Sequence, residues 1–203
     1  MATPKPFQLI SGHPALDLIN TLDHRYRDTG TEENLNTYED LLRFLTQSDL
    51  ISESKARKLK RLESTPADRA SVLQQAIALR EILATIAYAL LDHREIPEES
   101  LASLEAHVNQ ASAHRRLIAT DSKLEWKWSG LTRNLVSPLW LLAQSAAELL
   151  LSSQTANLRG CASETCRWLF LDTSKNHTRR WCEMKTCGNR MKARRFQARQ
   201  SWE

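Results

Sequence analysis

The four cysteines of this 203-residue chain all lie in one short segment near the C-terminus. They form a Cys-x4-Cys pair, a 15-residue gap and a second Cys-x4-Cys pair, which are Cys161, Cys166, Cys182 and Cys187. Two close thiol pairs joined by a loop are what a tetrahedral thiolate zinc site requires, and four thiolates leave the ion no position for a catalytic water. The spacing therefore predicts one structural zinc ion bound by these four residues.

Other interpretations of the cysteines stay open. Disulfides need an oxidising compartment, whereas the start of the chain, Met1 to Pro6, has no apolar run behind a basic start and does not resemble a signal peptide. Four unrelated buried thiols would also fit, since free cysteine packs as a small hydrophobe. A redox dithiol is less favoured because that chemistry uses Cys-x-x-Cys. Zinc is favoured because chance rarely places every cysteine at matched spacings.

The residues between the cysteines predict the elements that position them. Trp168–Leu171 suits a strand, Asp172–Asn176 a turn, and Arg179–Trp181 a second short strand that leads into Cys182. Met191–Gln200 contains no Gly or Pro and predicts a helix, which we expect to supply the last ligand from its first turn. A knuckle, a hairpin and a helix in this order form a treble-clef-like zinc module.

Basic residues are concentrated in the same segment. Residues 159–203 hold eleven Lys or Arg and four Asp or Glu, whereas residues 1–158 hold 17 and 20. On a helical wheel, Lys192, Arg195 and Arg199 fall within about 60° of one another, and like charges four residues apart destabilise an isolated helix. An anionic partner would relieve this repulsion, and nucleic acid is the commonest one. The alternative is a basic face that is only solvated.

The C-terminal segment resembles the CGNR zinc-finger family of bacterial proteins. The resemblance lies in the run Arg179–Met184, in Cys187–Ala193, which contains the family's Cys-Gly-Asn-Arg signature, and upstream in Cys161-x4-Cys166 and Trp168–Ser174. It implies that the four cysteines are zinc ligands and that the protein regulates transcription by binding DNA. The N-terminal run Phe7–Thr21 resembles the domain that usually precedes this finger, described as a stress-induced transcription regulator.

Double-stranded DNA is the partner that these features predict. Basic side chains would contact phosphates, and Asn189 with one or two arginines would read base edges. The candidate contacts are Arg179, Arg180, Lys185, Asn189, Arg190, Lys192, Arg194, Arg195 and Arg199. The first alternative is a protein-interaction module that docks an acidic partner. The second is RNA binding, in which Trp168, Trp181 or Phe196 would stack on bases.

Residues 1–155 predict a mainly α-helical domain ahead of the zinc module of residues 156–203. Thr37–Asp40 and Thr65–Asp68 resemble capping boxes, the sequence pattern of a helix start. Behind the second box, apolar residues recur at helical spacing and only Arg80 interrupts them. This run predicts the helix that anchors the core.

The end of this domain combines a hairpin and a helix. Residues 117–128 alternate as a small β-hairpin, which we expect to be the domain's only sheet. Residues 131–152 predict a final helix that Pro138 kinks or restarts, followed by a linker at Ser152–Thr155. Polar residues break the apolar stretches of this helix, so it is not expected to span a membrane.

Polar side chains gather near the N-terminus, around an apolar run at residues 15–19. On a helix that starts near Pro14, the side chains of Asp17, Asn20 and His24 would share a face. One interpretation is a pocket for a small-molecule effector, with the candidate residues His13, Asp17, Asn20 and His24. The other is helix capping and polar packing.

The sequence contains no motif that predicts catalysis. It has no Gly-rich phosphate loop, no Gly-x-Ser-x-Gly elbow and no His-Glu-x-x-His helix. We therefore expect a bacterial-type cytoplasmic regulator that is not an enzyme and does not contact a membrane. If the long helices formed a homodimer, its DNA site would be palindromic.

Overall fold

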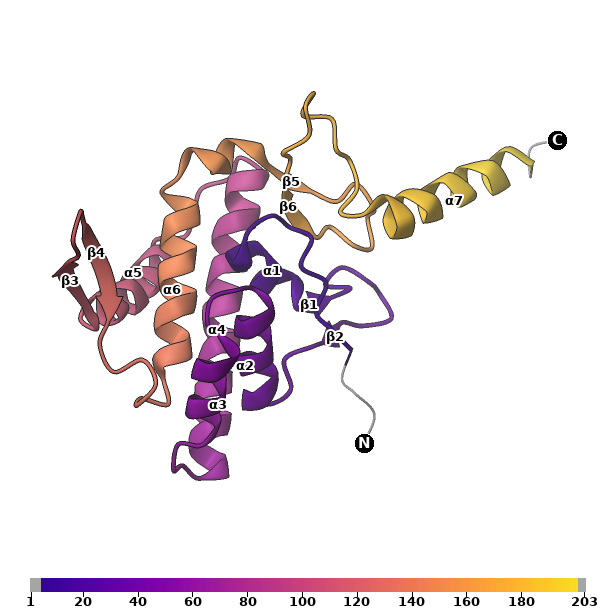
Figure 1. Cartoon of the computed structure of the whole chain (residues 1–203). Helices are drawn as coiled ribbons and strands as arrows, with labels where there is room; N and C mark the ends of the chain where they lie inside the picture. The colour runs from indigo at the N-terminus through magenta and orange to yellow at the C-terminus, as the bar shows by residue number, and fades with distance from the viewer. Residues whose placement is uncertain (1–4, 201–203) are drawn as a thin grey trace.

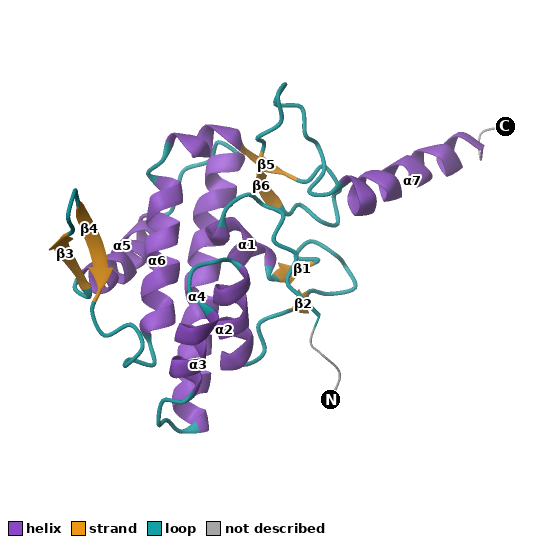
Figure 2. Ribbon diagram, viewed as in Figure 1, coloured by secondary structure: helices purple, strands orange, loops and turns teal. Residues whose placement is uncertain are grey.

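A computed structural model describes residues 5–200 of the chain, and within them the fold is mainly α-helical (Figures 1 and 2). Within residues 5–200, strands occur only as three small antiparallel pairs, β1–β2, β3–β4 and β5–β6. The elements are α1 (Pro14–Asn20), β1 (Leu22–Asp23), β2 (Glu32–Glu33), α2 (Tyr38–Gln47), α3 (Glu53–Lys60), α4 (Pro66–Leu91), α5 (Glu98–Ser112), β3 (Arg115–Ala119), β4 (Leu124–Trp128), α6 (Ser137–Leu150), the 3-10 helix η1 (Ser153–Asn157), β5 (Leu158–Gly160), β6 (Leu169–Leu171), the π-helix η2 (Met184–Gly188) and α7 (Asn189–Gln200). The predicted fold class, a helical domain with a hairpin followed by a small four-cysteine module, is confirmed.

Both predicted capping boxes are present. At the start of α4, the Asp68 amide donates to Thr65 Oγ1 at 3.1 Å, and the Thr65 amide donates to Asp68 Oδ2 at 2.8 Å. Thr37 and Asp40 make the same reciprocal pair at the start of α2. Each box satisfies backbone donors that the first helical turn leaves free, and such a cap stabilises a helix by about 1 kcal/mol.

The central element of the core is α4, which contacts α1, α2, α5 and α6 (Figure 1). By length and composition it could cross a bilayer, but half of its most apolar stretch is buried against these neighbours, as in the core helix of a water-soluble domain. Arg80 has only 2% of its side chain exposed and makes two hydrogen bonds of 2.7 Å to the Glu33 carboxylate. The polar interruption in the sequence therefore fixes β2 to the centre of α4.

Two predicted elements differ from the structure. The last helix starts at Ser137 rather than Leu131, because Pro138 has no amide proton and fits the first turn of a helix, where none is needed. The β3–β4 hairpin is confirmed, but it is not the only sheet of the helical domain, since Leu22 pairs with Glu33 and Asp23 with Glu32 in β1–β2. Two-residue strands are too short for an alternating pattern to reveal them.

The strand that pairs with β6 is β5, and not the run Arg179–Trp181, which is not a strand. Leu158 of β5 pairs with Leu171, and both side chains belong to the same apolar core as the helices. A Cβ at Gly160 would lie 2.9 Å from Leu91 Cδ2, so the absence of a side chain there lets β5 approach the end of α4. The expected linker at Ser152–Thr155 instead contributes to η1, which contacts α6 and β6.

Candidate metal centre and nucleic-acid interface

The four cysteines converge on one buried point. Their Sγ atoms all lie within 4.8 Å of one another, and each residue is 3–5% exposed. The Sγ of Cys182 lies 3.7 Å from that of Cys166 and 3.6 Å from that of Cys187. These separations exceed a disulfide bond of about 2.05 Å but match the edge of about 3.8 Å of a tetrahedron with Zn–S bonds of about 2.3 Å. The arrangement therefore fits one tetrahedral zinc ion.

The ionisation of the thiols also favours a bound cation. Hydrogen bonds from Cys166, Cys182 and Cys187 lower the pKa of Cys161, whereas hydrogen bonding to Cys161 and the other two thiols raises the pKa of Cys182. A first thiolate thus opposes ionisation of its neighbours. A divalent cation removes this conflict, because its charge stabilises four thiolates at once.

Local backbone geometry presents the first pair of ligands. The Cys161 amide donates to the Trp168 carbonyl at 2.8 Å, and the Cys166 amide donates to the Ser163 carbonyl at 2.9 Å. Arg167 completes this knuckle with a left-handed φ of 50°. The turn folds the chain back so that both sulfurs face the same point.

The last ligand lies in η2, immediately before α7, rather than in the first turn of that helix. Here the Gly188 amide donates to the Glu183 carbonyl at 3.1 Å. A Cβ at Gly188 would overlap the Met184 sulfur and lie 3.2 Å from Trp181 Cδ1, so a larger residue here would require the Met184 side chain to move. Cys187 thereby lies near the start of a helix, where free amides and the positive dipole end stabilise a thiolate.

Two candidate DNA contacts point into the module. Arg190 Nη2 donates to Cys187 Sγ and to Ser163 Oγ, both at 3.2 Å, and its Nε is buried without a hydrogen-bond partner among the residues that the structure describes. A cation that donates to a zinc-bound sulfur orients the ligand and stabilises its negative charge. The arginine of the signature therefore supports the metal site.

Arg179 joins the module to the N-terminal segment. Its guanidinium donates to the carbonyls of Trp181, Ile10 and Cys182 and lies 4.2 Å from the centroid of the Phe170 ring. Its backbone amide donates to Asp172 Oδ2 at 3.0 Å. The structure therefore uses this side chain for packing within the protein.

The other described candidates lie on the surface. Arg180, Lys185, Asn189, Lys192 and Arg194 are exposed along the loop before Cys182, η2 and α7. The side chains of Arg195 and Arg199 lie outside what the structure describes. Five of these seven residues belong to α7, which extends away from the helical domain (Figure 1), so its exposed Lys192 and Arg194 side chains are accessible to a large partner.

The zinc module is fixed to the helical domain by buried polar contacts. Asn20 Nδ2 donates to the Leu169 carbonyl at 2.9 Å, and the Leu169 amide donates to Asn20 Oδ1 at 3.0 Å. The Leu171 amide donates to the Ser11 carbonyl at 2.7 Å, and the Tyr88 hydroxyl donates to the Arg167 carbonyl at 3.1 Å. The side chain of Asn20 thus pairs with β6 as a neighbouring strand would.

The predicted N-terminal pocket residues separate into different roles. His13 caps α1, since its Nδ1 accepts from the Ala15 amide at 3.2 Å, and burial lowers its pKa. Asp17 is 6% exposed and accepts from the Ser11 amide at 3.0 Å, and burial raises its pKa. α1 ends at Asn20, and His24 follows with a left-handed φ of 55°. The expectation that His24 shares a helix face with Asp17 is therefore wrong.

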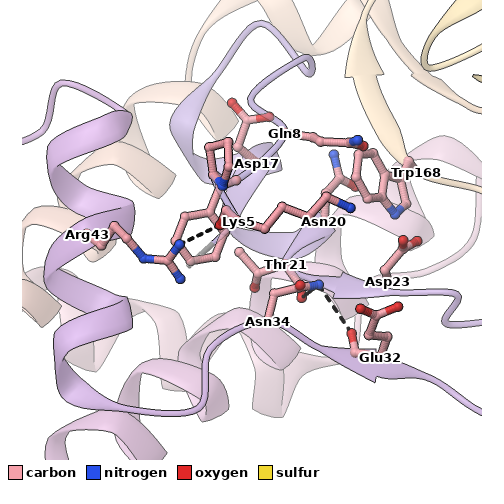
Figure 3. A pocket seen from close by; sticks show the side chains of 12 residues that line it. Lys5, Gln8, Asp17, Asn20, Thr21, Asp23, Glu32, Asn34, Arg43 and Trp168 are labelled. Atoms are coloured by element: carbon pink, nitrogen blue, oxygen red, sulfur yellow. Dashed lines mark hydrogen bonds between the residues drawn. The ribbon is translucent and has the colours of Figure 1, made fainter. Parts of the chain in front are cut away.

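A small polar cavity lies beside α1 (Figure 3). It has a volume of about 90 Å³, and Asp17 and Asn20 line it but His13 and His24 do not. Residues distant in sequence complete the wall, namely Lys5, Glu32, Asn34, Arg43 and Trp168. No local pattern marks these five residues, because only the packing of the N-terminal segment, β2 with the residue after it, α2 and the zinc module brings them to α1.

Fold and site together define a helical domain followed by a structural four-thiolate zinc finger. Residues 12–153 match the model of the ABATE family, described as a putative stress-induced transcription regulator. Residues 157–200 match the model of the CGNR zinc finger. The chain therefore belongs to the ABATE family and carries a CGNR zinc finger, in which Cys161, Cys166, Cys182 and Cys187 hold one structural zinc ion. Among curated proteins, none matches the chain.

Proposed function

We propose that this regulator binds double-stranded DNA through its zinc module. The observation that carries the proposal is α7, whose twelve residues include five Lys or Arg and no Asp or Glu. With its side chains an α-helix is about 10–12 Å across, and the B-DNA major groove is about 12 Å wide. An exposed helix of this charge is suited to that groove, where its basic side chains reach phosphates.

The two classes of basic residue have different tasks in this proposal. Arg179 and Arg190 hold the module in shape and support the zinc ligands. The contacts to DNA come from the exposed members, with Asn189 at the start of α7 next to the base edges. This division is testable, because replacing an arginine that supports the zinc ligands should lower zinc affinity, whereas replacing a phosphate contact should lower DNA affinity alone.

The decisive experiment is titration of zinc-loaded protein onto double-stranded DNA at several salt concentrations. Replacing Lys192, Arg195 and Arg199 with Gln should weaken binding, and should reduce the slope of log K against log salt by about 2.7 if all three contact phosphates. The matched control replaces Lys55, Lys58 and Lys60 of α3 with Gln. These residues are exposed, and their replacement removes the same three positive charges. Unchanged affinity in the α7 variant contradicts the proposal, and binding to an acidic protein that DNA does not compete supports the alternative.

We also propose that an effector in the cavity beside α1 controls the finger. Asn20 supports this coupling because it both lines the cavity and holds the Leu169 backbone of the zinc module. Asn20→Ala should change DNA affinity although Asn20 lies in the helical domain. Equal affinities of variant and parent, with zinc content unchanged, would contradict this coupling.

The proposed setting is the reducing cytoplasm of a bacterium, without catalysis. A closed sphere of four thiolates leaves no open position on the zinc ion, and thiolate ligands persist where disulfides do not form. Dimerisation on DNA belongs to the same proposal, and sedimentation of the complex on a palindromic site would measure its stoichiometry.

A further inference from the structure

A second group of metal-binding side chains lies outside the zinc module. Asp23, His24 and Glu32 each offer a ligand atom, and these atoms all lie within 4.8 Å of one another. The β1–β2 pairing produces this arrangement, because Asp23 lies directly opposite Glu32 and His24 follows in the turn. We propose that Asp23, His24 and Glu32 bind a divalent metal ion through one imidazole nitrogen and two carboxylates.

The imidazole of His24 is placed as a ligand would be. Its Nδ1 is inaccessible to solvent and has no hydrogen-bond partner among the described residues. Asp23 Oδ1 lies 3.4 Å from it, beyond the usual hydrogen-bond range. A tetrahedral ion with bonds of about 2.0–2.2 Å separates its ligand atoms by about 3.3–3.6 Å. The separation of the two atoms therefore falls in the range expected for two ligands of one metal ion.

The carboxylates of Asp23 and Glu32 also repel each other. Like charges directly opposite in an antiparallel pair destabilise it, and β1–β2 has only two residues in each strand. The Asp23 carboxylate accepts one hydrogen bond, from the His24 amide, and no described residue donates to the Glu32 carboxylate. A divalent ion would turn this repulsion into attraction and stabilise the pair.

The position of the site connects it to the rest of the protein. Asp23 and Glu32 line the cavity beside α1, where Figure 3 shows their carboxylates near Trp168. Asp23 and His24 also line a neighbouring hollow that the zinc ligands Cys166, Cys182 and Cys187 share. Three protein ligands leave a coordination position for water or for an oxygen atom of a small molecule. The proposal concerns metal binding itself and does not depend on DNA binding.

The ligand types indicate which ions to test. One imidazole and two carboxylates suit Zn²⁺, Mn²⁺ and Fe²⁺, whereas the four thiolates select zinc. Mn²⁺ is the sharper probe because it competes poorly for thiolates and broadens the resonances of nearby protons. We expect the full-length protein, already loaded with one zinc ion, to bind one further Mn²⁺ or Zn²⁺ per chain in equilibrium dialysis.

Two variants test the assignment. His24→Asn keeps a residue that tolerates a left-handed conformation, and Glu32→Gln keeps the size of the side chain. Each should weaken binding of the second ion at least about tenfold, the loss that even an outer-shell change causes at a metal site. The matched controls are His93→Asn, an exposed histidine with φ of 51°, and Glu95→Gln. Both controls should bind like the parent protein.

Bound Mn²⁺ should also broaden the imidazole resonances of His24. The proposal is overturned if neither ion binds beyond the first zinc equivalent at millimolar concentration. Equal binding by both test variants and both controls would overturn it as well. Retention of the first zinc equivalent shows in each case that the zinc module of the variant has folded.

Discussion

Around α4, the core consists of apolar side chains from α1, α2, α4 and α6, whereas the cluster within the zinc module consists of the four cysteines with Trp168 and Phe170. The helical domain thus holds most of the buried apolar side chains. The module contributes Leu158, Leu169 and Leu171 to that same core but has little apolar interior of its own. Metal coordination therefore replaces a hydrophobic core in a segment that is too short to build one.

Removal of zinc should have the largest effect on stability, and this effect should differ between the zinc module and the helical domain. Structural zinc contributes an apparent 10–16 kcal/mol or so in finger peptides, so chelation should unfold the module while α4 keeps its helical structure. Hydrogen exchange would show loss of protection at β6 and retention in α4. Loss of both together would mean that the two regions form one cooperative unit.

Truncation in the helical core should produce the converse result. Leu79 is fully buried on α4, and Leu79→Ala should lower the free energy of unfolding by about 2–5 kcal/mol through lost contacts and a cavity. Thermal or denaturant unfolding measures this change. Zinc content should stay at one ion per chain, and a variant that also loses zinc would show that the core holds the ligands in place.

The contact between the helical domain and the zinc module should be weakened by Asn20→Ala. This change leaves the amide and carbonyl of Leu169 without their partners, and each buried group left unpaired costs about 1–3 kcal/mol. Faster hydrogen exchange at β6 would report it. Asn109→Ala, an exposed change on α5, is the control and should alter nothing measurable.

Two arginines one helical turn apart should separate metal support from DNA contact. Arg190→Gln removes a donor to Cys187 Sγ and should weaken zinc binding about 10–100-fold. Arg194 is exposed, and Arg194→Gln should reduce DNA affinity without changing zinc affinity. Competition with a chromophoric chelator and DNA titration measure the two effects, and identical behaviour of both variants would remove the distinction.

The smallest effect should come from the cap of α4. Thr65→Ala should destabilise the helical domain by about 1 kcal/mol and leave zinc affinity unchanged. Hydrogen bonds from the Thr65 backbone amide and hydroxyl hold the pKa of Asp68 below its ordinary value. Because the folded-state pKa is lowered, this contribution is present at neutral pH and disappears as the pH falls below the ordinary Asp range. Urea unfolding at neutral and at acidic pH should show a larger difference between variant and parent at neutral pH, because the bond from the Asp68 amide to Thr65 Oγ1 does not depend on pH.

Local patterns were sufficient for several features of this protein. The capping boxes at Thr37 and Thr65 and the β3–β4 hairpin follow from residues close in sequence, and the structure confirms them. The second strand of the module was placed at Arg179–Trp181 because that run precedes Cys182. β5 takes this position instead, since Leu158 gains burial in the core of the helical domain.

The sequence by itself determined the zinc ligands, because two close thiol pairs constrain the chain wherever the rest of it lies. It also determined the class of fold, because helical periodicity and caps act over a few residues. Only the tertiary structure decided that Arg179 and Arg190 turn inward and that Asn20 pairs with β6. It alone placed Glu32 beside Asp23 and His24. These roles arise because packing buries certain polar groups, which must then find partners within the protein. No local sequence pattern specifies which groups become buried.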